Sequence, residues 1–263
     1  MTAIDTGRPH SARVYDWWLG GKDNYPVDEE LGKRILSVDP DVKTSAQANR
    51  SFMHRATRLL ARDGVRQFLD IGTGIPTEPN LHQIAQSVAP DARVVYADND
   101  PIVLRHAEAL LRSTPEGSTD YLEADVREPE QILGQARAIL DFSEPIALSL
   151  VALTHFISEE DDGVYDLVRG YVAALAPGSF LVLSQLTPDV DAEKMAQAVE
   201  HFRRGGTGLY PRPLAGFTRF FDGLALLDPG VALVSGWRPD PAEPPVGPAP
   251  LYAGVARKSQ GNS

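Results

Sequence analysis

The chain has no cysteine among its 263 residues. This absence excludes disulfide scaffolds, thiolate zinc sites and cysteine nucleophiles, and it suits a reducing cytoplasm. The six histidines are scattered, with no pair three or four residues apart. Because metal sites built on a helix need ligands at such spacings, the sequence predicts no metal.

Long apolar runs and basic clusters are missing as well. No stretch approaches the roughly 18 apolar residues of a membrane-spanning helix, and the first thirty residues hold no apolar run of signal-peptide length. Lysine and arginine never form a run longer than two, and 25 basic against 36 acidic residues give a net charge of −11. This charge would repel a polyanion. We therefore expect a cytoplasmic protein with no nucleic-acid and no membrane partner, whose oligomeric state the sequence leaves open.

The composition is that of a folded domain, with 43% hydrophobic and 23% charged residues. From Val65 onward short β-rich runs alternate with helical patterns, which is typical of a parallel sheet covered by helices on both faces. The pattern predicts an α/β fold. Its expected strands are Arg66–Ile71, Arg93–Ala97, Asp120–Ala124, Ile146–Val151 and Phe180–Gln185.

Helices are expected between these strands. The most regular apolar spacing covers residues 164–175, after a capping-box pattern at Ser158 and Asp161. Proline in a first helical turn predicts two other helices, which begin at Pro79 and at Pro101.

The last third of the chain predicts one more helix and an antiparallel strand pair. The helix covers Ala192–Phe202 and ends before a glycine-rich break. Residues 239–250 contain six prolines in twelve positions, which predicts a surface loop. Strand-like runs flank that loop, as an antiparallel pair would, and they are Ala225–Leu227 with Val231–Ser235 before it and Tyr252–Arg257 after it.

Residues 1–64 differ from the rest because only helices are expected there. The first helix carries Val14, Trp17 and Trp18 on one face, the second begins at Pro26, and the third covers Val42–Asp63. We interpret residues 1–64 as an N-terminal helical cap and residues 65–263 as the main domain. The tryptophans could serve core packing, or the helices could cap a pocket.

A strand that ends in an acid and a tight glycine turn is the central motif. Asp70 precedes Gly72 by two residues, and Thr73 and Gly74 complete the turn. Glycines at the carboxyl end of a parallel strand let the backbone approach a ligand closely. A nicotinamide-binding fingerprint would have a third glycine where Thr77 stands, so that cofactor is disfavoured. Asp70 would repel a pyrophosphate but can accept hydrogen bonds from an ammonium group, which predicts a ligand with an amine.

Acids also follow the next two expected strands. Asp98, followed by Asn99, stands where a carboxylate could bind both hydroxyls of a ribose. Asp125 stands where an acceptor could meet an adenine amino group, beside the amide of Val126. Each acid alone could simply cap a helix or a turn. Three acids at three successive strand ends favour a binding site.

The chain resembles the class I S-adenosylmethionine-dependent methyltransferases. It resembles more closely a bacterial S-adenosyl methyltransferase family formerly catalogued as a domain of unknown function. The resemblance covers nearly the whole chain, and the glycine motif alone would be far less specific. Its segments are 12–25 (ARVYDWWLGGKDNY), 67–74 (QFLDIGTG), 92–101 (ARVVYADNDP), 148–156 (LSLVALTHF), 176–184 (APGSFLVLS) and 252–258 (YAGVARK).

This resemblance implies a Rossmann-like, seven-stranded sheet of order 3-2-1-4-5-7-6 with strand 7 antiparallel. It also implies S-adenosylmethionine as the cofactor. Pro76 departs from the pattern, because many relatives of the superfamily have a third glycine there. The residues implied to bind the cofactor are Asp70, Gly72, Thr73 and Gly74 for its methionine part, Asp98 with Asn99 for the ribose, and Asp125 with Val126 for the adenine.

Two further segments are candidates for substrate binding and catalysis. His155, just beyond the fourth expected strand, is the candidate nearest the transferred methyl group, as a general base or as a residue that only lines the pocket. The Gly20–Tyr25 turn is distinctive of the family and is expected to lie over the cofactor or substrate, or else merely to end a helix. The expected substrate and lid residues are Tyr15, Trp18, Lys22, Asn24 and Tyr25.

The favoured function is therefore methyl transfer to a small-molecule acceptor. One alternative is a sensor or pseudoenzyme that binds S-adenosylmethionine without turnover. Another is a nicotinamide dehydrogenase, which Asp70 and Thr77 disfavour. Nothing in the sequence distinguishes an oxygen, nitrogen or carbon nucleophile, because a fold does not fix a substrate.

Overall fold

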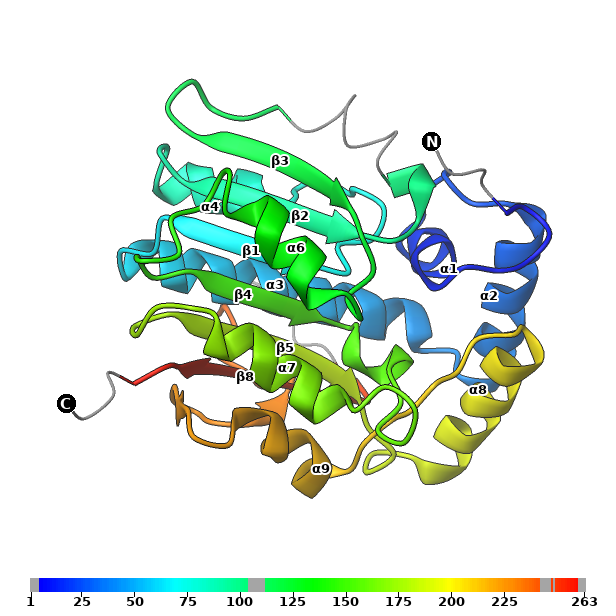
Figure 1. Ribbon diagram of the computed structural model, residues 1–263. Coiled ribbons are helices and arrows are strands. Elements are labelled where there is room, and N and C mark those ends of the chain that lie inside the picture. Colours follow the sequence, from blue (N-terminus) through cyan, green and yellow to red (C-terminus); the bar gives the residue numbers. More distant parts are fainter. Residues whose placement is uncertain (1–4, 104–111, 242–246, 248, 260–263) are drawn as a thin grey trace.

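The computed structural model describes residues 5–103, 112–241, 247 and 249–259. Its centre is one sheet with the strand order β3-β2-β1-β4-β5-β8-β6, and β7 also pairs with β8 (Figure 1). The first five strands are parallel, and β8 runs antiparallel to β5, β6 and β7. The strands are β1 Gln67–Ile71, β2 Arg93–Asp98, β3 Ser118–Glu123, β4 Ala147–Val151, β5 Phe180–Leu186, β6 Ala225–Leu226, β7 Ala232–Leu233 and β8 Leu251–Arg257.

This order confirms the expected fold class. The C-terminal strand β8 takes the position of strand 7, and the short strands β6 and β7 share its free side. The five expected parallel strands agree with the observed ones to within two residues at each end. The antiparallel pairing on either side of the proline-rich segment is confirmed as well. Residues 242–246 and 248 of that segment lie outside the described residues.

Helices cover both faces of the sheet because each inner strand is apolar on both sides. In β1, Leu69 and Ile71 join the core under α6 and α7, whereas Phe68 joins the core under α3 and α4. Figure 1 shows α6 and α7 in front of the sheet and α3 behind it. The described helices are α1 Ser11–Leu19, α2 Pro26–Val38, α3 Val42–Arg62, α4 Leu81–Val88, α6 Pro129–Ala136, α7 Val164–Ala173, α8 Ala192–Arg204 and α9 Leu214–Thr218, with short 3-10 turns at Thr154–Phe156 and Arg219–Phe221.

Two predicted helix starts are wrong. The helix expected at Pro79 begins at Leu81, since the Asn80 side chain caps it and the Pro79 carbonyl accepts hydrogen bonds from α3 instead. The helix expected after a Ser158 capping box begins at Val164. Ser158 Oγ accepts from two backbone amides of a separate turn, and Gly163 turns into the helix with a φ of 59°. The start at Pro101 is confirmed, and residues 104–111 lie outside the described residues.

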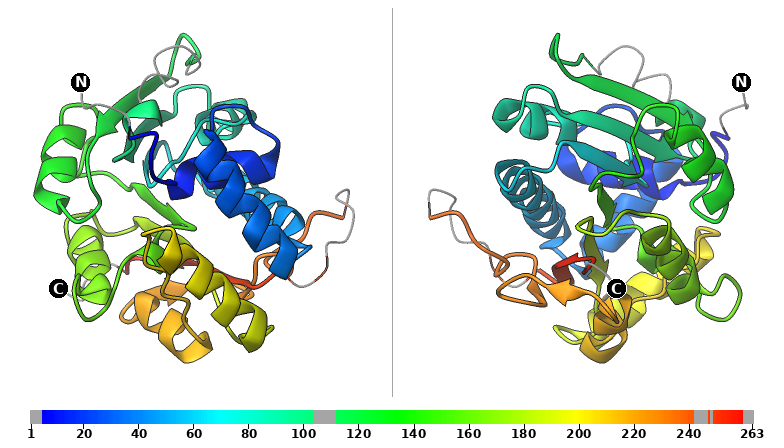
Figure 2. Two further views of the ribbon diagram at one scale, coloured as in Figure 1. Left: turned by 90° about the vertical axis from the view of Figure 1, so that its right-hand side faces the viewer. Right: turned by 60° about the vertical axis from the view of Figure 1, so that its left-hand side comes forward.

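The three N-terminal helices divide between the sheet and its edge. Helix α3 shares a core with β1 and β2, through Phe52 and Leu60 among others. Helices α1 and α2 instead lie beyond the carboxyl ends of the parallel strands, next to α8 (Figure 2). Trp18 of α1 packs in an apolar cluster with Phe202 of α8. The edge at which parallel-sheet proteins bind ligands is therefore covered by helices from both ends of the chain.

Arg13 fastens α1 to the end of β2. The buried Arg13 guanidinium has its Nε 3.3 Å from Asp100 Oδ2 and 3.7 Å from Asp28 Oδ1. Its two terminal nitrogens donate to the backbone carbonyls of Asp5 and Arg8. The N-terminal residues, α1, α2 and the loop after β2 are thus tied together by one cation.

Candidate functional site

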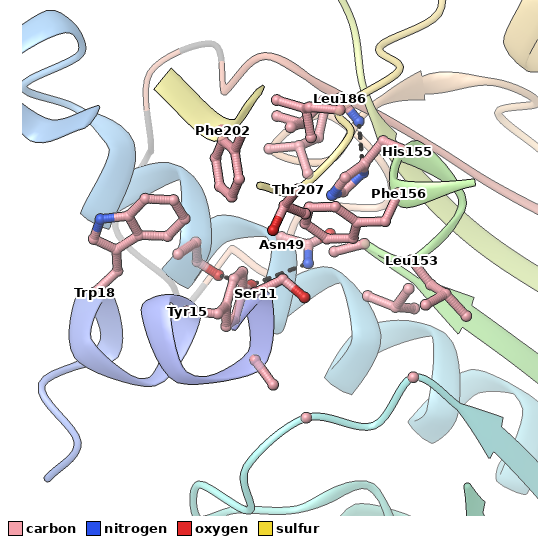
Figure 3. Close-up of a pocket in the computed structure, with 18 of the residues that line it drawn as sticks. Ser11, Tyr15, Trp18, Asn49, Leu153, His155, Phe156, Leu186, Phe202 and Thr207 are labelled. Carbon is pink, nitrogen blue, oxygen red and sulfur yellow. Dashed lines mark hydrogen bonds between the residues drawn. The ribbon is translucent and has the colours of Figure 1, made fainter. Parts of the chain in front are cut away.

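A cavity of about 520 Å³ lies at the carboxyl ends of the parallel strands, between α1, α3 and α8 (Figure 3). Two groups of predicted site residues line it. The strand-end group comprises Asp70, Gly72, Thr73, Gly74, Asp98, Asn99, Val126 and His155, and the α1 group comprises Tyr15 and Trp18. The fold therefore brings to one space most of the residues that the sequence pointed to separately.

The glycine turn brings backbone up against this cavity. Gly72 and Gly74 have φ values of 72° and 67°, in the left-handed region that favours glycine. A Cβ built on Gly72 would stand 2.6 Å from Leu153 Cδ1, so the turn packs directly against the chain that follows β4. The Gly72 amide donates to the Ala97 carbonyl at 2.8 Å, which ties the turn to β2.

Asp70 is a buried carboxylate at the start of this turn. Thr73 Oγ1 donates to Asp70 Oδ2 at 2.5 Å. Burial raises the pKa of Asp70 to about 6, against the lowering effect of that hydrogen bond. An ionised Asp70 in this position favours a cationic ligand group, since a cation would restore the interactions that burial removed.

Asp98 connects the loop that follows β1 with the loop that follows β2. Its Oδ2 accepts from the Gly74 amide at 2.8 Å, and its Oδ1 accepts from the Asp100 amide at 3.0 Å. Burial raises the pKa of this carboxyl above its ordinary value. Each oxygen keeps a lone pair for a ligand hydroxyl.

The family resemblance implies that Asp98 binds the ribose of the cofactor. On that expectation, replacing Asp98 by alanine should weaken the binding of S-adenosylhomocysteine by about 1–3 kcal/mol, because two ribose hydroxyls would lose a charged acceptor. Asp98→Asn, which keeps one oxygen for the Gly74 amide, should lose less. Isothermal titration calorimetry measures both variants. Unchanged affinity in Asp98→Ala would mean that the ribose binds elsewhere.

Asp125 follows β3 beside the cavity, next to its lining residues Ala124 and Val126. Its oxygens accept from Asn99 Nδ2 and from the Arg127 amide, both at 2.9 Å. Asn99, Val126 and Arg127 line the cavity. Arg127 also pairs with Asp162 through its Nε at 2.7 Å. Asp125 thus holds Asn99 and Arg127 in position, and those two residues face the ligand space.

Arg50 of α3 is a site residue that the sequence reasoning missed. It lines the cavity near Asp70, and its buried Nε has no hydrogen-bond partner. Its terminal nitrogen donates to the Pro79 carbonyl at 3.0 Å, and burial lowers its pKa. An unpartnered cationic donor beside an acid fits a ligand that carries both a carboxylate and an ammonium group. No local motif marks Arg50, because α3 reaches the site only through tertiary packing.

His155 is buried and electrically neutral in this environment. Burial, followed by the charge of Arg212, lowers the pKa of His155 to about 3. Its Nδ1 accepts from the Leu186 amide at 3.4 Å, which leaves the ring proton on Nε2. Figure 3 shows Nε2 pointing into the cavity. His155 therefore offers a hydrogen-bond donor rather than a basic lone pair.

The remaining expected lid residues lie away from the cavity lining. Lys22 is exposed. Asn24 Nδ2 donates to Asp16 Oδ2 at 2.8 Å, and the Tyr25 ring lies under the Arg13 guanidinium at 5.3 Å. The contact with the cavity is made by α1 itself, through Tyr15, Trp18 and other side chains.

The turn after α1 is nevertheless specific in its geometry. The Asp16 carboxylate accepts from the Asp23 amide at 3.0 Å as well as from Asn24. A Cβ on Gly21 would stand only 1.9 Å from Asp16 Oδ1, so this position needs glycine. The turn fixes the carboxyl end of α1 and hence the side chains that α1 presents to the cavity.

Comparison with known proteins identifies the family. A family model described as S-adenosyl methyltransferase matches residues 1–259. The chain belongs to this S-adenosyl methyltransferase family. The methyltransferase is 44% identical to a DUF574 family protein from Streptomyces avermitilis, with a TM-score of 0.94 over 97% of this chain and 100% of that one. No curated protein matches.

A second solved relative supports the same family. The methyltransferase is 41% identical to a candidate methyltransferase from Thermobifida fusca, with a TM-score of 0.88 over 97% of each chain. The plantazolicin methyltransferase BpumL, solved with a triazolic desmethylPZN analogue and S-adenosylhomocysteine, is only 10% identical with a TM-score of 0.53 and shows the fold alone. The protein is thus an S-adenosylmethionine-dependent methyltransferase, and S-adenosylmethionine is its cofactor.

The lining of the cavity fits this cofactor. The acids Asp70 and Asp98 suit its ammonium group and ribose, and Arg50, whose Nε has no hydrogen-bond partner, suits its carboxylate. In the part of the chain that the structure describes, no three side chains of histidine or acidic residues are grouped as a metal ion would need. No helix of the same part is long and apolar enough to cross a membrane.

Proposed function

We propose that this methyltransferase acts on a small-molecule acceptor, which binds between the cofactor loops and α8. The observation that carries the proposal is the continuity of the cavity. It extends from Gly72 and Asp98 at the sheet edge to Trp18 and Phe202 on α1 and α8. A space that is walled by helices on the far side suits a ligand of limited size better than a macromolecule. We place the protein in the cytoplasm, where a chain without cysteine forgoes no disulfide.

We infer the following roles for the cofactor loops. Arg50 and Asp70 bind the two charged groups of the methionine part, Asp98 binds the ribose, and Asn99 with Val126 borders the adenine. When bound, the cofactor supplies a methyl group on a positively charged sulfur. An acceptor atom can bond to the methyl carbon, in line with the carbon–sulfur bond that breaks, without covalent help from the protein. The protein's contribution is to hold donor and acceptor in line and to keep water out.

The N-terminal segment 1–64 acts, in this proposal, as the cap of the site. Helices α1 and α2 close the carboxyl edge of the sheet, while α3 anchors them to its face. Tyr15 Oη donates to the Ala46 carbonyl at 2.8 Å and accepts from Asn49 Nδ2 at 3.1 Å, so α1 is bonded to α3 at the cavity wall. Lys22, Asn24 and Tyr25 support the cap from outside the cavity.

The proposal predicts which cofactors stabilise the protein. S-adenosylmethionine and S-adenosylhomocysteine at a hundredfold excess over their dissociation constants should stabilise it by about 2.7 kcal/mol, which corresponds to about 5–10 °C in Tm. NAD should cause no shift. Differential scanning fluorimetry makes the comparison, with adenosine alone as a control for the nucleoside part. A shift with NAD and none with the adenosyl compounds would refute the proposal.

A further inference from the structure

A continuous row of rings forms the wall of the cavity that faces away from the glycine turn. Tyr15 and Trp18 of α1, Phe202 of α8, and Phe156 and His155 after β4 follow one another with ring centroids 6.4, 6.5, 5.9 and 4.4 Å apart. Figure 3 shows Trp18, Phe202, Phe156 and His155 around one space. Rings prefer edge-to-face or offset contacts with other rings, so such a wall suits a planar aromatic ligand.

His155 directs a polar group into this aromatic chamber, where Ser11, Asn49 and Thr207 also lie (Figure 3). The Nε2–H of His155 points into it, and Nδ1 is held by the Leu186 amide at 3.4 Å. The ring is 4% exposed, so the donor is largely shielded from water. Nε2–H has no hydrogen-bond partner among the described residues, and a ligand oxygen or nitrogen opposite it would gain a hydrogen bond that is shielded from water.

The side of the cavity between α2, α3 and α8 carries an excess of acidic side chains. Asp39, Asp41 and Asp191 line it there, and Lys194 lies with its Nζ 3.7 Å from Asp191 Oδ2. The arginines of the lining, Arg50 and Arg127, belong to α3 and to the loop after β3, so three carboxylates face one ammonium group on this acidic side. An incoming carboxylate would be repelled, whereas a neutral or cationic molecule would not.

We propose that the methyl acceptor is a planar aromatic molecule without net negative charge, which presents a hydrogen-bond-accepting atom to His155. This inference rests on the proposed function, because the chamber adjoins the cofactor loops. It assigns His155 to substrate recognition rather than to proton removal, and a proton that the methylated product carries is then lost to bulk water after the product leaves. It also makes Trp18, Phe156 and Phe202 determinants of substrate shape.

Three matched probes test the proposal: 2-naphthamide, 2-naphthoate and 2-ethylnaphthalene. They share a ring system and differ in being a neutral acceptor, an anionic acceptor and a molecule without an acceptor. Each is titrated calorimetrically into the protein alone and into the protein saturated with S-adenosylhomocysteine. We expect the amide to bind about tenfold more tightly than either of the other probes. The hydrocarbon lacks the shielded hydrogen bond to His155, and the naphthoate is repelled by the acidic side chains of the cavity.

Variants of His155 identify the donor. In His155→Leu the preference for the amide over the hydrocarbon should vanish, whereas His155→Gln, which keeps an N–H near the same place, should retain most of it. His201→Leu on α8, outside the cavity lining, is the matched control and should bind all three probes as the unmodified chain does. Circular dichroism melting confirms that each variant is folded, and the probe comparison on the unmodified protein stands without them.

The outcomes separate this inference from the proposed function. Suppose that S-adenosylhomocysteine binds. The aromatic proposal alone would then be overturned if the protein bound the amide and the hydrocarbon with equal affinity, bound the naphthoate more tightly than the amide, or bound none of the probes. Absence of S-adenosylhomocysteine binding would overturn the proposed function, and the titrations without it would still decide whether the chamber binds neutral aromatic molecules.

Discussion

Asp70→Asn is expected to abolish measurable S-adenosylmethionine binding at pH 7 and, at the same time, to stabilise the ligand-free protein. Both effects have one cause, which is that the Asp70 carboxylate is buried and has no cationic ligand group beside it in the ligand-free protein. Burial raises the pKa of Asp70 from 3.8 to about 6. The charged form is therefore disfavoured in the folded state and contributes a cost that asparagine removes.

The pH dependence of this effect follows from linkage. Between about pH 4 and pH 6 the folded protein holds a proton on Asp70 that the unfolded chain has lost, so the free energy of unfolding falls as the pH rises through this window. The total cost is about 2–3 kcal/mol, at ~1.4 kcal/mol for each pH unit of the shift. Asp70→Asn should gain this amount at pH 7 and nothing at pH 4.

Urea unfolding at the two pH values measures the stability, and calorimetry with S-adenosylmethionine measures the binding. The control is Asp166→Asn, at an exposed carboxylate on α7 that pairs with Arg169. It should change neither quantity by more than about 0.5 kcal/mol. In the unmodified protein, affinity should fall about tenfold per pH unit below 6, because the ligand's ammonium group needs the ionised carboxylate. A variant that binds normally at pH 7 would show that Asp70 does not hold the ammonium group.

Gly72→Ala is the second change with a large expected effect. Its Cβ would stand 2.6 and 2.8 Å from the two Cδ atoms of Leu153, and the φ of 72° is unfavourable for any residue with a Cβ. We expect a loss of about 2–4 kcal/mol in the free energy of unfolding, from backbone strain and overpacking together. Because Gly72 and Leu153 both line the cavity, S-adenosylhomocysteine binding should be lost as well.

The chain offers a matched control at Gly134. This glycine lies inside α6, and a Cβ there would meet nothing within 4 Å. Gly134→Ala should stabilise the protein by about 0.5–1 kcal/mol. The double variant Gly72→Ala with Leu153→Ala removes the clash but not the backbone strain, and it should recover part of the lost stability. If Gly72→Ala melts like the unmodified protein, the loop must adopt another backbone path.

Local patterns explain why the strands were predictable and some helix starts were not. The apolar runs that end at Asp70 and Asp98 are buried on both sides, so their hydropathy alone marks them. The strand order came from the resemblance to a family and not from periodicity. The start of α4 depends on α3, since Arg50 and His54 bind the carbonyl of Pro79. No pattern within residues 79–88 reveals such a distant partner.

The candidate site likewise has residues that local sequence marks and residues that only tertiary packing brings to the cavity. Acids at strand ends can be located from sequence, because parallel strands end at one edge. Arg50 and Phe202 could not, because α3 and α8 reach the cavity only by tertiary packing, and no local motif marks either residue. The choice between a general base and a residue that only lines the pocket, which the sequence left open for His155, also depends on information that the sequence lacks. Only the fold shows that a backbone amide faces Nδ1 and that burial keeps the ring neutral.

The position of Arg13 has a practical consequence for anyone who produces this enzyme. Its guanidinium binds the carbonyls of Asp5 and Arg8 while it pairs with Asp100, whose amide donates to Asp98. An affinity tag fused ahead of Asp5 would therefore be attached close in sequence to the carbonyls that bind Arg13, which pairs with Asp100 next to Asp98, the carboxylate that we propose binds the ribose. The C-terminal end of β8 points toward the opposite edge of the sheet (Figure 1), away from the cavity. A purification handle belongs at that end, and an N-terminal fusion should be cleaved off before affinities are measured.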